Sequence, residues 1–186
     1  MAVVSFRAQR GLSQVVSTLI LLVVAVLLAG SVTYFATNVV STRSQVEDIQ
    51  VSFEHVWVNS TGAIGAFKIK SLGGRDLLLD KVMVRGVESS WSDVYFYRVP
   101  SGTSVTSDLT VASYSSLTGA TVEIGSYNYT QASGDVPLPS GGELLVYIKD
   151  PDNVQVDDIG TAIEMSVQTS RAQYISVCNA RASATQ

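Results

Sequence analysis

The chain has 186 residues, of which 46% are hydrophobic and 15% are charged, and its formal net charge is -4. This length allows one domain plus a helix, and an acidic balance without any Lys/Arg cluster argues against a nucleic-acid partner. The single cysteine, Cys178, excludes a disulfide framework, so packing and hydrogen bonds must hold the fold. Because it lies in an apolar run, Cys178 is expected to be a small core residue.

An uncharged run covers residues 11–42, and its apolar part, residues 15–36, is long enough to cross a bilayer as a helix. The charges before it, Arg7 and Arg10, are both basic, which favours a cytoplasmic N-terminus and sends the rest of the chain outside. We expect the helix to continue to about Ile49, with Arg43, Gln45, Glu47 and Asp48 at the point where it emerges into water. Residues 12–49 would then form a rod of roughly 55–60 Å.

This run has more than one interpretation. An ordinary secretory signal is disfavoured, because the run is too long and no small-residue cleavage site clearly follows it. A permanent single-span anchor fits its length and flanking charge. Alternatively, a short leader, residues 1–11, is removed and the helix stays on the mature protein. The order of residues favours the last interpretation, since Arg10 and Gly11 directly precede Leu12-Ser13-Gln14, which opens the apolar run.

The segment around Arg10 and Gly11 resembles the class III signal peptide of archaeal type IV pilins, and SQVVSTLILLVVAVLLAG is similar to that family's helix core. The resemblance implies cleavage between Gly11 and Leu12 by a leader peptidase. It also implies an assembly ATPase and a membrane platform as partners. Bacterial members usually carry Glu at the fifth mature position, where this chain has Val16, so the resemblance is to the archaeal branch. The archaellin, the subunit of the archaeal swimming filament, shares the leader and is an alternative.

A helix that is apolar on every side must be covered on every side. Lipid covers it before assembly, and copies of the same helix cover it in a filament. Small residues such as Ala25 and Ala29 would let neighbouring backbones approach closely. The residues expected to pack in the filament core are Val15, Val16, Leu19, Leu22, Val23, Val26, Leu27, Gly30, Tyr34 and Phe35.

Beyond residue 49 the pattern changes from continuous to alternating hydrophobicity. The odd-numbered residues from Val51 to Trp57 are apolar or aromatic, which predicts that they share one face of a strand. Further strands are expected at residues 63–70, 77–84, 93–99, 104–111, 120–130, 143–149, 162–167 and 172–177. Because turn-forming residues separate these runs, residues 50–186 are expected to form an all-β, Ig-like sandwich or barrel. The predicted fold class is therefore α+β.

The sequence offers no catalytic constellation. Its one histidine, His55, lies in an alternating strand beside aromatic residues and far in sequence from Cys178, so neither a triad nor a zinc site is expected. Acidic residues at 150–158 are the best metal candidates, but they lack the ordered spacing of a calcium loop, and a solvated turn is the simpler interpretation. We expect no enzyme activity, no cofactor and no metal.

Two tripeptides, Asn59-Ser60-Thr61 and Asn128-Tyr129-Thr130, match the acceptor pattern for N-glycosylation. If the head lies outside the cell, Asn59 and Asn128 are possible glycan sites. Residues 103–133 are rich in Ser, Thr and Tyr and carry few charges. They are interpreted as a subunit contact, an outward-facing loop or an ordinary surface hairpin.

The expected function is that of a structural subunit of an archaeal surface filament, a helical homopolymer that serves attachment. Its precursor would lie in the cytoplasmic membrane with the N-terminus inside. The alternatives are an archaellin and a single-span membrane protein whose β domain binds a partner or solute.

Overall fold

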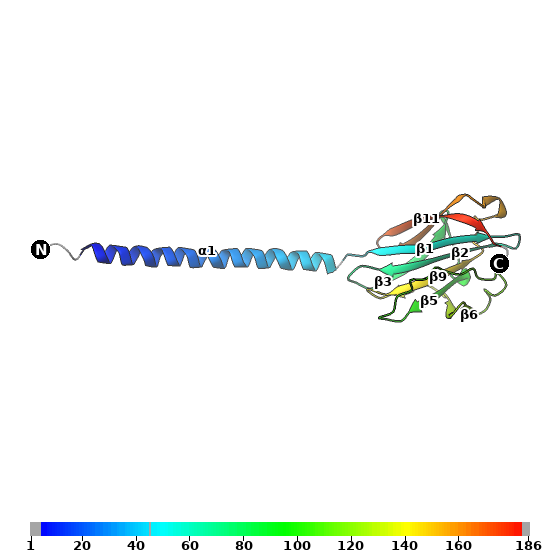
Figure 1. Ribbon diagram of the computed structural model, residues 1–186, viewed down its shortest axis with the longest axis horizontal. Helices are drawn as coiled ribbons and strands as arrows, with labels where there is room; N and C mark the ends of the chain where they lie inside the picture. The colour runs from blue at the N-terminus through cyan, green and yellow to red at the C-terminus, as the bar shows by residue number, and fades with distance from the viewer. Residues whose placement is uncertain (1–4, 45, 184–186) are drawn as a thin grey trace. The chain divides into compact units, whose positions relative to one another are not determined.

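The computed structural model describes residues 5–44 and 46–183, with the side chains of residues 13–42 and 46–183. The chain divides into two compact units, Met1–Ser44 and the head, Gln45–Gln186. The first unit is one helix and the second is a mixed 11-stranded sheet that curls into a half-barrel (Figure 1). The α+β class predicted from the sequence is therefore confirmed.

Helix α1 (Ser5–Ser44) contains 40 residues, including part of the predicted leader. The prediction that it continues to Ile49 is wrong, because β1 (Ile49–Val58) begins there. The carbonyl of Asp48 accepts hydrogen bonds from the N–H groups of Leu72 (2.8 Å) and Gly73 (3.2 Å). Since these bonds come from a distant turn of the head, the backbone at residue 48 belongs to the β unit rather than to the helix.

The head contains a long antiparallel sheet interrupted by one parallel pair, β1 with β11. Its strands lie in the order β4-β3-β10-β11-β1-β2-β9-β5-β7-β6, and β8 pairs with β3. The strands after β1 are β2 (Ala63–Ser71), β3 (Leu77–Val84), β4 (Val87–Glu88), β5 (Val94–Val99), β6 (Thr121–Ile124), β7 (Tyr127–Gln131), β8 (Val136–Leu138), β9 (Glu143–Lys149), β10 (Ala162–Thr169) and β11 (Gln173–Ala182). Single turns of 3-10 helix occupy Trp91–Asp93 and Val156–Asp158.

The predicted strand at residues 104–111 is absent, and residues 100–120 contain no strand. We call residues 100–120 the cover segment. Its backbone is held by side chains of the sheet rather than by a neighbouring strand, as described below. The predicted strand at residues 120–130 is instead the β6–β7 hairpin, with Gly125 at a positive φ of 61° in its two-residue turn.

The prediction that Val51 and Trp57 share one face of β1 is also wrong. The register with β2 shifts between Ser52 and His55, and Phe53 has a positive φ of 58°. This β-bulge inserts a residue and reverses the alternation. As a result, Val51 packs against the same core as Val56, whereas Phe53 packs against the same core as Trp57.

Two hydrophobic cores cover opposite faces of the central strands. The main core contains Phe67 of β2 and Val146 of β9, and Cys178 packs against it. The second core contains Ile64 and Tyr147 from the same two strands, together with Leu117 of the cover segment. Because neighbouring strand residues point to opposite faces, β2 and β9 are buried on both sides. The cover segment thus forms an irregular outer layer over the sheet.

Cys178 is half-buried and is a free thiol. Burial raises its pKa to about 11, so the thiolate is scarce at neutral pH. The expectation of a core residue is met only in part, because Cys178 packs against the main core but is itself half-buried.

At Gly73 the turn after β2 packs closely against residues 46–48, the first described residues of the head. A Cβ atom at Gly73 would lie 2.5 Å from the carbonyl oxygen of Val46 and 2.9 Å from the amide nitrogen of Asp48. We expect Gly73→Ala to lower the free energy of unfolding by about 1–3 kcal/mol, because neither backbone atom can move aside cheaply. Urea unfolding of the full chain in micelles, followed by tryptophan fluorescence, measures this, since both tryptophans lie in the head.

Gly134→Ala is the matched control, because a Cβ atom there would meet no atom within 4 Å. Equal stability of the two variants would contradict the close approach at Gly73.

Candidate assembly surface and the junction with the head

The surface of α1 is apolar and exposed over residues 13–42. Over Ser13–Thr42, 30 residues long, the peak mean hydropathy is 2.8 and none of that window is buried. The large side chains predicted to form the filament core are all exposed, from 52% at Val16 to 73% at Tyr34. A Cβ atom at Gly30 would meet nothing within 4 Å. Cover for this surface must therefore come from lipid or from another protein chain.

The exposed side chains do not form a single stripe. Consecutive residues from Leu19 to Val24 each expose 45–68% of their surface. Because successive residues of a helix point in directions about 100° apart, such a run faces all sides. An amphipathic helix lying on a membrane or on a protein surface would instead leave one face polar.

Six Ser and Thr hydroxyls in the described part of α1 find their acceptors within the helix. Ser17 donates to the carbonyl of Ser13 (2.9 Å), and Thr33 donates to that of Ala29 (2.8 Å). The same back-bonding is made by Thr18, Ser31, Thr37 and Thr42. Hydroxyls bonded in this way do not require water, so these residues can enter an apolar environment at little cost.

The apolar span is longer than a bilayer requires. Thirty residues of helix extend about 45 Å, whereas the hydrocarbon core of a bilayer is about 30 Å thick. The core helix of a soluble domain would be mostly buried, which this helix is not. The structure thus leaves an N-terminal apolar helix that fits a membrane anchor or a signal sequence.

The chain that follows the helix is anchored to the head within a few residues. The carboxylate of Glu47 is 8% exposed and accepts a hydrogen bond from the hydroxyl of Thr169 at 3.0 Å. Arg171 Nε lies 3.6 Å from the other oxygen of Glu47. The sequence predicted that Glu47 emerges into water at the helix end, and this is wrong because the β10–β11 turn buries it. No local signal could have identified these partners, which are more than a hundred positions away.

The predicted cleavage residues Arg10, Gly11 and Leu12 lie within α1. Their side chains lie outside the described part of the structure, so the cleavage remains a prediction.

Both predicted glycosylation sites lie on the head. Asn59, in the turn between β1 and β2, is half-buried, and its side-chain oxygen accepts hydrogen bonds from the N–H groups of Thr61 (2.7 Å) and Gly62 (3.2 Å). Asn128 is exposed on β7, whereas the next residue, Tyr129, is buried. Asn128 is therefore the more accessible of the two.

Two of the acidic residues considered as metal ligands, Asp150 and Asp158, are engaged in structural contacts. Asp150 accepts a hydrogen bond from the Tyr114 hydroxyl (3.1 Å), and Asp158 accepts from Arg85 (2.7 Å) and from the N–H of Gln155 (2.9 Å). In the described residues, no group of three or more His, Cys, Asp or Glu side chains could hold a metal ion.

His55 ties the cover segment to β1. Its Nε2 lies 2.6 Å from Oδ1 of Asp108, and its ring stacks on Trp57 with centroids 4.9 Å apart. The hydrogen bond with His55 lowers the pKa of Asp108, which is also held by the N–H of Leu109. The sequence could place His55 in a strand but could not identify an acidic partner 53 positions away.

Two charged side chains hold the first part of the cover segment. Glu143, 3% exposed, accepts hydrogen bonds from Lys70 Nζ (2.8 Å), from the Ser104 hydroxyl (2.7 Å) and from the Val105 N–H (3.2 Å). Lys68 Nζ donates to the carbonyl of Val105 at 2.8 Å. Both backbone polar groups of Val105 are thus satisfied by side chains, which explains how this buried residue dispenses with a strand partner.

Comparison of the sequence with models of protein families returned no match, and no curated protein matches it. Conclusions about function therefore depend on the residues and geometry described above. The resemblance of the N-terminal segment to archaeal pilins contributes only to a proposal.

Glu143 makes the stability of the head depend on pH. Burial by itself would raise the pKa of this carboxyl, but the hydrogen bonds from Lys70, Ser104 and Val105 outweigh it and lower the pKa from 4.5 to about 2. A lowered pKa in the folded state stabilises the head above pH 4.5, and the contribution is lost as the pH falls towards 2. We expect Glu143→Gln to cost about 1.5–3 kcal/mol at neutral pH and to flatten the pH dependence.

Urea unfolding at a series of pH values between 7 and 2 measures this effect. Glu164→Gln, at an exposed position on β10, is the matched control. A constant difference in stability between wild type and Glu143→Gln across the series would show that Glu143 does not titrate as expected.

Proposed function

We propose that the chain is a structural subunit of an archaeal type IV pilus-like surface filament, which polymerises through α1 and serves attachment to surfaces. The observation that carries the proposal is the apolar surface of Ser13–Thr42, which is exposed on every side and receives no cover from its own chain. In a filament, copies of the same helix supply that cover. The partner in assembly is therefore the chain itself.

Two properties of the helix favour protein neighbours as its final environment. Its apolar length of about 45 Å exceeds what one bilayer covers, and helices packed side by side at staggered heights would bury the remainder. Six of its Ser and Thr hydroxyls are bonded within the helix, so a dry interface would leave none of these six groups unpaired. Gly30 adds a point where a neighbouring backbone can approach closely.

The rest of the life cycle follows from the resemblance of residues 10–14 to pilin leaders. The precursor lies in the cytoplasmic membrane with its N-terminus inside. A leader peptidase cuts after Gly11, and an assembly ATPase acting through a membrane platform adds subunits to the filament. The head forms the outer surface, where Asn59 and Asn128 would be available for glycans.

An archaellin would use the same helix and leader, and assays of swimming and of adhesion distinguish the two filaments. A single-span β-domain protein would keep α1 in lipid permanently. Such a protein would form no filaments, and this result would leave the helix with a membrane role only.

The position of leader cleavage is the first test. We expect the mature protein from its native host to begin at Leu12, as determined by N-terminal sequencing. Gly11→Val should block cleavage and leave the precursor in the membrane, whereas Val16→Ile, beyond the cleavage position, should be processed normally. A mature chain that begins at Met1 would contradict the pilin assignment.

The packing of the helix is the second test. Gly30→Leu keeps the span apolar and replaces a poor helix former with a good one, a gain of about 1 kcal/mol in helix propensity. Membrane insertion and cleavage should therefore persist. We expect filaments seen by negative-stain electron microscopy to be lost or strongly reduced, because the added side chain prevents close approach of neighbouring backbones.

Val32→Leu is the matched control, since Val32 is 67% exposed and already presents a branched apolar side chain. If Gly30→Leu forms filaments as abundantly as wild type does, Gly30 does not lie in the proposed interface. Absence of filaments in the wild type itself would contradict the filament assignment.

A further inference from the structure

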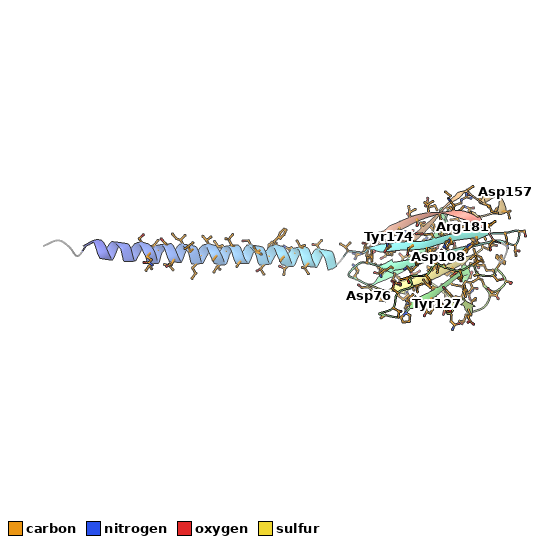
Figure 2. All side chains as sticks on the ribbon, viewed as in Figure 1. Asp76, Asp108, Tyr127, Asp157, Tyr174 and Arg181 are labelled. Carbon is orange, nitrogen blue, oxygen red and sulfur yellow. The ribbon has the colours of Figure 1, made fainter. Side chains whose placement is uncertain are left out.

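A hollow of about 180 Å³ opens on the head between the cover segment, the β6–β7 hairpin and β9. Its walls include Asp108 and Thr110 of the cover segment, Ser126 and Tyr127 of the hairpin, and the buried side chain of Tyr147. Figure 2 labels two of these residues, Asp108 and Tyr127. Typical sites for drug-sized ligands measure about 300–1,000 Å³, so this hollow suits a single small ring.

Asp108 gives the hollow a fixed acceptor. Its Oδ1 is occupied by His55 Nε2 and by the N–H of Leu109. The carboxylate is ionised at neutral pH, because the hydrogen bond with His55 lowers its pKa. With 64% of the side chain exposed, Oδ2 can accept hydrogen bonds from a ligand.

Tyrosines supply the apolar part of the walls. Tyr127 is half-buried and packs on Tyr97 with ring centroids 4.8 Å apart. Behind it, Tyr129 meets Tyr147 edge to face at 5.0 Å, and the Tyr147 hydroxyl donates to the carbonyl of Thr110 at 2.7 Å. Burial raises the pKa of Tyr147 to about 12, so its hydroxyl stays neutral. The aromatic rings are therefore held in fixed positions before any ligand arrives.

We propose that this hollow binds one neutral sugar residue of a glycan. A sugar ring offers an apolar face to an aromatic side chain and hydroxyl groups to hydrogen-bond acceptors. The hollow provides both, with Tyr127 for the face and Asp108 for the hydroxyls, and Ser107 and Ser126 add further hydroxyl groups. The pairing of an apolar wall with a few fixed polar groups is the usual basis of small-ligand recognition.

The charges around the hollow disfavour the other ligand classes. No Lys or Arg lines it, so an anionic ligand would meet Asp108 without compensation. A cation would find the carboxylate already bonded to His55, and Arg181 also lowers the pKa of Asp108 by its charge. A neutral, hydroxyl-rich ligand is not repelled by Asp108 and does not need a free carboxylate as a counter-ion.

The inference rests on the proposed function for one point only, namely that the head lies outside the cell, where it would meet a glycan. The walls of the hollow belong to the head alone, so binding does not require assembly. Within that function, the site would give attachment a defined ligand class.

The test uses the full chain in polyoxyethylene detergent, which contains no sugar headgroup. The probes are the methyl glycosides of glucose, galactose, mannose and N-acetylglucosamine, followed by saturation-transfer NMR and by amide shifts of the protein. We expect at least one glycoside to bind in the millimolar range and to shift amides of residues 107–110 and 125–127. Tyr127→Ala and Asp108→Asn should each weaken binding about tenfold, whereas Tyr127→Phe should retain it.

Tyr174→Ala and Asp157→Asn are the matched controls, a half-buried tyrosine on β11 and an exposed aspartate in the turn Val156–Asp158. In Figure 2, Asp157 and Tyr127 lie at opposite margins of the head. Both controls should bind like wild type. Thermal unfolding of every variant identifies any loss of binding that comes from misfolding.

Three results would overturn the inference. They are absence of binding by all four glycosides, shifts confined to other residues, and saturable binding of tetramethylammonium at the same amides, which would indicate a cation site. The inference and the filament assignment can fail separately. Gly30→Leu should lose filaments and keep glycoside binding, whereas Tyr127→Ala should lose binding and keep filaments.

Discussion

The exposed apolar surface of α1 over residues 13–42 is the constraint that the fold of this chain leaves unsatisfied. Removing apolar surface from water contributes about 25 cal/mol per Å², and none of the apolar window within Ser13–Thr42 is buried. That free energy is available only when lipid or other chains surround the helix. Six Ser and Thr hydroxyls of α1 are bonded within the helix, so these groups can leave water at little cost. The apolar surface of residues 13–42 therefore needs cover from lipid or from other chains.

The head, by contrast, completes its own burial. β2 and β9 are covered on both faces, once by the rest of the curled sheet and once by the cover segment. The cover segment has no strand partner and is held by Glu143, Lys68, Tyr147 and the pair of His55 with Asp108. The hollow beside Tyr127 lies where this irregular layer meets the β6–β7 hairpin, so the same contacts that stabilise the head also shape its candidate ligand site.

The first described residues of the head are held by contacts with the rest of the head. Glu47 is buried against the β10–β11 turn, and the carbonyl of Asp48 binds the turn after β2. The β unit therefore includes the residues that directly precede β1.

Periodicity in the sequence determined the helix, most strands and the α+β class, because these features depend on the spacing of apolar residues along the chain. Periodicity failed at Phe53, where one inserted residue in a β-bulge reverses the alternation. It also failed at residues 104–111, where the pattern is that of a strand but side chains of the sheet hold the backbone. Periodicity also could not predict where the helix ends or that the hollow exists. Their partners lie far apart in sequence, 53 positions from His55 to Asp108 and 122 from Glu47 to Thr169. Only tertiary structure brings such groups within hydrogen-bonding distance, and the spacing of residues along the chain does not show which groups will meet.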